Sequence, residues 1–212
     1  MKLHNYFRSS ASFRVRIALA LKGLSYEYVS VHLARGEQFN EDFTQINTNA
    51  LVPVLEVNGL RLTQSMAIIE YLEETHPTPA LLPADAAGRA RVRALTQSIA
   101  CEIHPLNNLR VLKYLSNSLK LDEDQKNMWY RHWVRLGLEA FEKQLGAGET
   151  GRYCHGDTPS LADCTLVPQI FNGKRFNVDF SGLTKTMAIF DACMALPAFQ
   201  QAQPSACPDF EV

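Results

Sequence analysis

One dipeptide constrains the fold of the first part of this chain more than any other feature. Asn58-Gly59 lies between two short runs of strand-forming residues, Val54 to Val57 and Leu60 to Thr63. Asn-Gly is the preferred pair for a two-residue type I′ turn, because both turn positions need a positive φ. The sequence therefore predicts an antiparallel β-hairpin.

The segments around this hairpin alternate between strand and helix patterns. Strands are predicted at residues 3–7 and 26–33, and helices at about 9–22 and, more weakly, 39–46. A third helix follows the hairpin, since apolar residues from Ile68 onward keep helical spacing. The order is β-α-β-α-β-β-α, which predicts an α/β domain.

The pattern changes after residue 78. His76 to Pro79, followed by Pro83, is typical of a linker. Strand patterns fade beyond it, so we predict domains at residues 1–78 and 84–212, with the second domain all-α. Two helix starts are predicted there, Asp122 to Asp124 from its negative charge and Ser160 to Asp163 from its capping residues.

The helix after Asp124 carries a second pattern. Its apolar residues at helical spacing form one stripe, made by Trp129, Trp133, Leu136 and Ala140. We interpret the two tryptophans and all five cysteines as structural.

Charge and cysteine content exclude several classes of protein. Lys and Arg number 21 against 22 acidic residues, so there is no electrostatic footprint for nucleic acid or an anionic membrane. The five cysteines are scattered and form no CxxC pair, which argues against a disulfide framework or a metal site. Without an apolar run of membrane or signal-peptide type, we expect a cytoplasmic protein.

Several segments of the chain resemble one family, the zeta class of glutathione transferases. The clearest are residues 9–19 (SSASFRVRIAL), 67–74 (AIIEYLEE) and 172–179 (NGKRFNVD), and residues 101–110 resemble its bacterial branch. The likeness covers essentially the whole chain. It implies the glutathione transferase fold, in which a thioredoxin-like glutathione-binding domain precedes an all-helical substrate domain. It also implies a homodimer.

The first of these segments departs from the family signature SSCSWRVRIAL at two positions. Ala11 stands in place of the Cys, and Phe13 in place of the Trp. The loss of the Cys argues against a mechanism that uses a protein thiol here. The thiol of the glutathione cofactor is then the only nucleophile expected.

The resemblance implies a set of glutathione-binding residues. Ser9 and Ser10 stand where a strand passes into a helix N-terminus, and hydroxyl and backbone N–H groups there can hold a thiolate. Which serine contacts the sulfur stays open, and both could simply be caps. The full implied set is Ser9, Ser10, Ala11, Gln38, Val52, Pro53, Gln64, Ser65, His104 and Asn108.

Two other pairs in this set have a physical interpretation. Family members hold the proline of Val52-Pro53 in cis, so that the Val backbone pairs with glutathione like an open strand edge. Gln64-Ser65 opens a helix whose N–H groups can bind the γ-glutamyl carboxylate. An ordinary turn proline and an N-cap are the alternatives.

Three arginines are implied as substrate-binding residues. The family acts on small dianionic diketo acids, and Arg pairs with carboxylates in a fork geometry. We expect Arg8, Arg110 and Arg175 to bind them, with Arg8 also catalytic beside Ser9 and Ser10. Arg14 and Arg16 lie inside the first helix and are interpreted as structural.

The function implied is glutathione-dependent cis–trans isomerisation by reversible thiolate addition. The bacterial branch points to conversion of maleylpyruvate into fumarylpyruvate in gentisate breakdown. Maleylacetoacetate isomerisation in tyrosine breakdown, a conjugating glutathione transferase and a non-catalytic scaffold of the same fold stay open as alternatives.

Overall fold

The computed structural model describes residues 1–211 and divides into two compact units. The first unit joins Met1–Leu81 to the C-terminal residues from Met194 onward, and the second is Leu82–Cys193. The first unit contains the sheet, and the second is helical.

The sheet of the first unit has the order β2-β1-β3-β4. Its strands are β1 (Lys2–Asn5), β2 (Glu27–Ser30), β3 (Val54–Val57) and β4 (Leu60–Thr63). β1 pairs in parallel with β2 and antiparallel with β3, while β3 and β4 form the hairpin. Asn58 and Gly59 have φ values of 51° and 77°, as a type I′ turn requires. The predicted hairpin and the βαβαββα order are confirmed.

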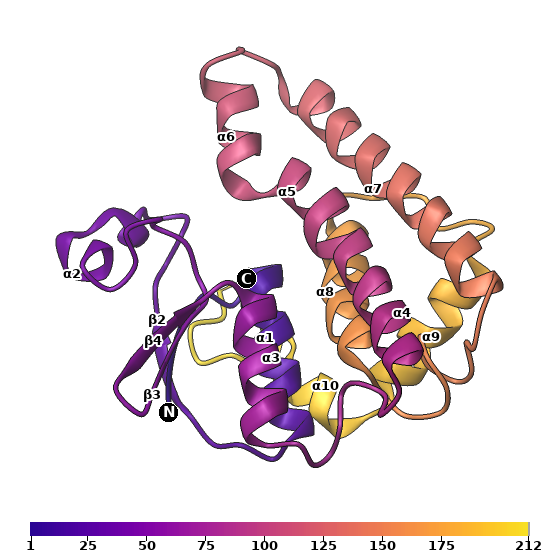
Figure 1. Cartoon of the computed structure of the whole chain (residues 1–212). Coiled ribbons are helices and arrows are strands. Elements are labelled where there is room, and N and C mark those ends of the chain that lie inside the picture. Colours follow the sequence, from indigo (N-terminus) through magenta and orange to yellow (C-terminus); the bar gives the residue numbers. More distant parts are fainter. Residues whose placement is uncertain (212) are drawn as a thin grey trace. The chain divides into compact units, whose positions relative to one another are not determined.

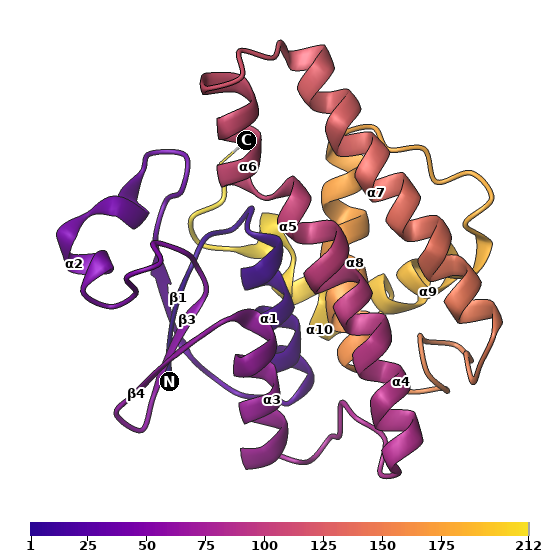
Figure 2. The same ribbon diagram turned by 45° about the horizontal axis from the view of Figure 1, so that its top comes forward.

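Two helices cover one face of this sheet. α1 (Ser10–Leu21) and α3 (Ser65–Thr75) pack side by side, whereas η1 (Glu37–Phe39) and α2 (Glu41–Thr44) lie on the other side (Figures 1 and 2). α1 ends at Leu21, and Gly23 follows its C-cap with a φ of 64°, which suits a residue without a Cβ. Leu3, Ile17 and Ile68 are fully buried in the core between the layers.

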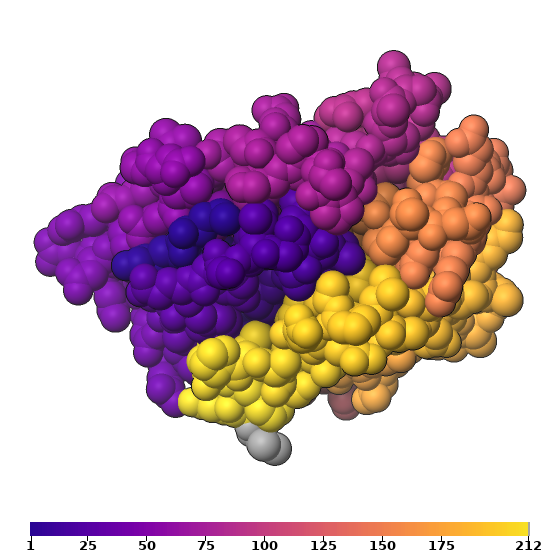
Figure 3. Space-filling model, turned by 90° about the horizontal axis from the view of Figure 1, so that it is seen from below, coloured from indigo at the N-terminus to yellow at the C-terminus, as the bar shows by residue number. Residues whose placement is uncertain are grey.

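The C-terminal residues complete this first unit. α10 (Pro197–Ala202) packs on α1, and η3 (Pro204–Ala206) follows it. The buried guanidinium of Arg16 donates to the carbonyl oxygen of Ala202 over 2.9 Å and to that of Phe7 over 3.1 Å. In Figure 3 the yellow C-terminal residues lie against the indigo first helix.

The compact units differ here from the predicted domains 1–78 and 84–212. The prediction assigned the C-terminal residues to the helical domain because strand patterns fade after the linker. In the structure they belong to the first unit, because α1 is buried on more than one side and α10 supplies part of its cover.

The second unit is a group of packed helices. They are α4 (Ala86–Gln97), a π-helical turn η2 (Ser98–Ile103), α5 (His104–Asn107), α6 (Leu109–Asn117), α7 (Glu123–Gly146), α8 (Leu161–Arg175) and α9 (Thr184–Met194). α4 packs on α8, and α7 packs on η2, α5 and α6. Asp122 caps α7 with a capping box, and Ser160 and Asp163 form another at α8, which confirms both predicted helix starts.

The predicted stripe of α7 is not the buried face of this helix. The buried residues are Tyr130, Val134, Leu138, Phe141 and Leu145, whereas Leu136 is half exposed and Ala140 is exposed. Two apolar stripes run along this helix, and the sequence prediction followed the more exposed one because it contains the two large tryptophans. Trp129 lies half-buried, and its indole N–H donates to the carbonyl oxygen of Leu106 over 2.9 Å.

Within residues 1–211, the structure contains no helix with the length and apolar character needed to span a membrane.

Candidate functional site

The N-terminus of α1 is an open helix end. Ser9 is the N-cap, and its Oγ accepts the N–H of Ser12 over 3.1 Å. Its hydroxyl hydrogen stays available for donation, since a hydroxyl can accept and donate at once. The first turn has no acidic residue, and the N–H groups of Ser10 and Ala11 have no acceptor within the described chain. This end can receive an external anion.

The backbone before β3 is a second open position. The Val52-Pro53 peptide bond is cis, in agreement with the expectation from the family likeness. Val52 is 7 % exposed, and no hydrogen bond of its N–H or C=O occurs among residues 1–211. Buried backbone groups need partners, so this position can accept an extended peptide ligand.

The N-terminus of α3 carries an unusual backbone. Gln64, its N-cap, has φ 68° and ψ 114°, which a side chain with a Cβ rarely adopts. Ser65 follows as the first helical residue and is buried. Backbone strain of this kind persists where the surrounding structure fixes it, and it clusters at binding sites.

A cation stands directly behind Ser65. The guanidinium of Arg14 is buried and donates to the Ser65 hydroxyl over 3.3 Å. Arg14 was interpreted as structural, and its contact with Ser65 shows a position from which it can also support carboxylate binding at α3. The sequence held no signal for this pair, because the two residues are 51 positions apart.

Gln38 offers a buried amide on η1. Its side chain is 5 % exposed, and its Oε1 finds no hydrogen-bond partner in the described residues. An unsatisfied buried polar group is costly unless a ligand completes it. Gln38 therefore has the properties of a ligand-binding residue.

Arg8 lies between β1 and α1, directly before Ser9. Its guanidinium stacks over the Phe7 ring at 5.0 Å and donates to the backbone carbonyl of Glu211 over 3.2 Å. The side chain is exposed. Arg8 is thus oriented by two contacts beside the open end of α1.

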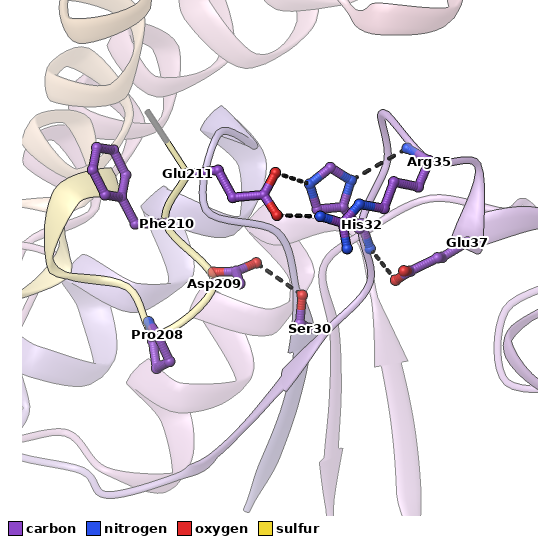
Figure 4. Close-up of a pocket in the computed structure, with 8 residues that line it drawn as sticks. All are labelled: Ser30, His32, Arg35, Glu37, Pro208, Asp209, Phe210 and Glu211. Atoms are coloured by element: carbon purple, nitrogen blue, oxygen red, sulfur yellow. Dashed lines mark hydrogen bonds and ion pairs between the residues drawn. The ribbon is translucent and has the colours of Figure 1, made fainter.

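A pocket opens beside this arginine, between the segment after β2 and the C-terminal segment (Figure 4). Its lining consists of Ser30, His32, Arg35, Glu37, Pro208, Asp209, Phe210 and Glu211. Figure 4 shows the Glu211 carboxylate facing the His32 ring and the Arg35 guanidinium. None of these lining residues was among the predicted site residues.

The other predicted residues lie in the second unit. Asn108 is the N-cap of α6, and its Oδ1 accepts the N–H of Val111 over 3.1 Å. Arg110 follows on the same helix and is exposed. Arg175 ends α8, where it donates to Asn172 over 2.9 Å. His104 begins α5.

Two of the buried cysteines, Cys154 and Cys193, do not compete for the role of nucleophile. Burial raises the pKa of the Cys154 thiol, and the nearby Asp163 carboxylate raises it further. Burial and Asp163 likewise raise the pKa of Cys193. Both thiols stay protonated at neutral pH, whereas the thiolate is the reactive form.

Residues 1–74 match the family described as glutathione S-transferase, N-terminal domain. A maleylpyruvate isomerase from a Ralstonia species is 50 % identical over 210 residues, which cover 99 % of each chain. The holo structure of a zeta-class maleyl pyruvate isomerase matches all of both chains at 49 % identity, with a TM-score of 0.98. The chain belongs to the zeta class of glutathione transferases.

Other relatives of this zeta-class transferase have a different named substrate. A probable maleylacetoacetate isomerase from Vibrio cholerae is 48 % identical and covers 98 % of this chain and 97 % of its own. The maleylacetoacetate isomerase of Anaeromyxobacter dehalogenans, solved with bound glutathione, is 44 % identical, covers 99 % and 97 % of the two chains and has a TM-score of 0.89.

Most of the predicted glutathione-binding residues of this zeta-class transferase lie in its first unit. Ser9, Ser10 and Ala11 lie at α1, Val52 and Pro53 before β3, Gln64 and Ser65 at α3, and Gln38 on η1. Open helix ends, an unpaired backbone and a buried unsatisfied amide fit a tripeptide thiol with two carboxylates. These roles stay predictions, as do those of His104, Asn108, Arg110 and Arg175.

Proposed function

We propose that this zeta-class transferase is a glutathione-dependent cis–trans isomerase that converts maleylpyruvate into fumarylpyruvate, as in gentisate breakdown. The open N-terminus of α1 behind Ser9 and Ser10 carries the proposal, because it can hold a thiolate while offering no protein thiol of its own. The names of the relatives at 48–50 % identity support the isomerase class.

The residues of the first unit would hold glutathione. The Ser9 hydroxyl and the N–H groups of Ser10 and Ala11 keep the sulfur ionised by hydrogen bonding to the charged form. Val52 pairs with the peptide backbone, and Gln38 accepts an N–H of the tripeptide. Gln64 and Ser65, with Arg14 behind them, bind the γ-glutamyl carboxylate.

When bound, glutathione supplies the thiolate that adds reversibly to the cis double bond. The protein's part is to orient a dianionic substrate and to stabilise negative charge on its ketone oxygen. Arg8, Arg110 and Arg175 are proposed for the two carboxylates, since guanidinium groups pair with carboxylates in a fixed fork. His104 and Asn108 complete the proposed cofactor site, in a cytoplasmic homodimer.

The experiment is to follow loss of maleylpyruvate and formation of fumarylpyruvate, with and without catalytic glutathione, and then to titrate the remaining thiol. Turnover that requires glutathione without consuming it supports the isomerase. Stoichiometric loss of thiol contradicts it and indicates a conjugating transferase. No turnover combined with no retention on a glutathione column indicates a scaffold.

Maleylacetoacetate is the second candidate substrate, because relatives with that name match this chain nearly as well. The two substrates share the maleyl end and differ in the length of the keto-acid tail. A comparison of kcat/KM for both decides between them. A higher value for maleylacetoacetate overturns the proposed substrate and keeps the isomerase.

The arginine assignment has its own test. Replacing Arg8 or Arg175 with Gln removes a charge-assisted hydrogen bond to a carboxylate, worth about 1.5–3 kcal/mol. The expected loss in kcat/KM is roughly 10- to 100-fold. An unchanged kcat/KM in both single variants contradicts the assignment.

A further inference from the structure

The C-terminal segment Pro208–Glu211, which we call the strap, lies across the ends of two strands in the first unit. Cys207, directly before it, is 8 % exposed in the hydrophobic cluster that also contains Phe7, Val31 and Val52. The strap is therefore anchored in the same core that supports the proposed glutathione residues.

Asp209 is the centre of the strap. One carboxylate oxygen accepts the backbone N–H of Phe7 over 3.3 Å and the Ser30 hydroxyl over 2.9 Å. The other accepts the hydroxyl of Tyr28. β1 and β2 are parallel, so this one side chain joins their carboxyl ends. Binding sites of α/β sheets lie at this edge.

The next two residues of the strap continue toward Arg8. The Phe210 ring packs edge-on against Phe7, with 5.6 Å between centroids and an interplanar angle of 82°. The backbone carbonyl of Glu211 accepts a hydrogen bond from the Arg8 guanidinium over 3.2 Å. The same guanidinium lies over the Phe7 ring. Phe7 and Arg8 are thus held from the C-terminal side.

The side chain of Glu211 holds a second segment. Its carboxylate pairs with His32 Nε2 over 3.2 Å and with the Arg35 guanidinium (Figure 4). The backbone N–H of His32 donates to Glu37 over 2.6 Å, directly before Gln38. The strap therefore connects the loop that carries Gln38 to the turn that carries Arg8 and Ser9.

We propose that the strap is part of the catalytic apparatus, with Asp209 as a positioning residue for the Phe7–Ser9 turn and Glu211 as a positioning residue for the loop before Gln38. The role of Asp209 rests on the proposed isomerase function, whereas the role of Glu211 rests only on glutathione binding. The chain must be intact to residue 211 for both segments to keep their geometry.

We expect the loss of the Asp209 contacts and the loss of the Glu211 contacts to have different kinetic effects. In Asp209→Asn the charge that holds the Phe7 N–H is lost, and a misplacement of Arg8 by about 1 Å is expected to lower kcat/KM for maleylpyruvate roughly 10- to 100-fold. In Glu211→Gln the backbone contact with Arg8 remains. The KM for glutathione is expected to rise about two- to fivefold with little change in kcat, as for loss of an exposed ion pair.

The controls separate positioning from folding. Asp191→Asn neutralises an exposed carboxylate on α9 and is expected to match the wild type. Thermal unfolding is measured for every variant. If Asp209→Asn does not fold, Phe210→Ala tests the contact between the strap and Phe7 instead. Phe210 is 43 % exposed, so its replacement leaves the core intact.

The outcomes are distinct. Asp209→Asn and Glu211→Gln variants that are folded and behave like Asp191→Asn overturn the proposal. An inactive wild type contradicts the proposed function, and calorimetric glutathione affinity then decides the role of Glu211: weaker binding in Glu211→Gln supports it, and equal binding overturns it.

Discussion

Two helices of this protein begin with the same kind of residue and treat their N-termini in opposite ways. Ser9 caps α1 and Ser160 caps α8. Three positions after the cap, α1 has Ser12 and α8 has Asp163, whose carboxylate accepts from the Ser160 N–H and the Ser160 hydroxyl, both over 2.7 Å. One helix end is closed by its own anion, and the other is open.

A third helix shows that an open end in this fold accepts a carboxylate from elsewhere. Glu142 on α7 accepts the N–H groups of Lys185 and Thr186 at the start of α9, over 2.9 and 2.8 Å. The difference between a structural and a ligand-binding helix end is therefore the source of the anion, not the cap itself.

The largest expected effect is a loss of stability at the closed N-terminus of α8. Asp163 is fully buried and also accepts the N–H of Cys154 over 2.9 Å. Asp163→Ala leaves several buried donors without a partner, and we expect a loss of about 3–5 kcal/mol in the free energy of unfolding. Denaturant titration measures it, and a loss below about 1 kcal/mol would show that α8 does not depend on its capping box.

The next effect comes from converting the open end into a closed one. Ser12→Asp gives α1 the cap spacing of α8 and puts a negative charge where the thiolate is proposed to bind. We expect glutathione-dependent turnover to fall by more than about 100-fold, equivalent to about 2.7 kcal/mol. Ser12→Asn is the neutral control of the same size. Equal activities in the two variants would contradict thiolate binding at α1.

The same substitution at the two caps sharpens the comparison further. Ser9→Ala removes the proposed donor to sulfur, so kcat/KM is expected to fall about 10- to 100-fold, as for a charge-assisted hydrogen bond. Ser160→Ala is expected to lower stability by about 1 kcal/mol and leave kcat unchanged. Ultraviolet titration of the bound thiol checks the cause, because the pKa of glutathione should rise only in Ser9→Ala.

The smallest effect concerns Glu142 and depends on pH. Burial raises the pKa of this carboxyl, but hydrogen bonds from Thr186 and Lys185 lower it more, so its pKa lies below the usual 4.5. A lowered folded-state pKa contributes stability above about pH 4.5, and that contribution is lost as the pH falls through the folded-state value.

Glu142→Gln is expected to lower the free energy of unfolding by about 1–2 kcal/mol at pH 7, as for loss of a helix cap. The difference from the wild type should shrink below about pH 4.5, where the wild-type carboxyl begins to be protonated in the unfolded state. Urea titrations at several pH values measure it. A difference that is independent of pH would assign the effect to packing.

The sequence determined the local features of this protein, because their signals lie within three or four residues. Asn58-Gly59 predicts its hairpin from the φ values of two residues, and Ser160 to Asp163 predicts a helix start from one side chain and its own backbone. Each of these was confirmed. The change from strand to helix at Ser9 and Ser10 was predicted in the same local way and is confirmed, whereas thiolate binding at this helix end stays a prediction.

Only the tertiary structure decided which distant residues meet. The Asp209 contact with Phe7 spans 202 positions and the Arg16 contact with Ala202 spans 186, so no local pattern can predict either. The buried face of α7 was also decided by packing, because two apolar stripes satisfy the same helical period. Local hydrogen bonds are determined by neighbouring residues, whereas burial depends on what the rest of the chain places against each face.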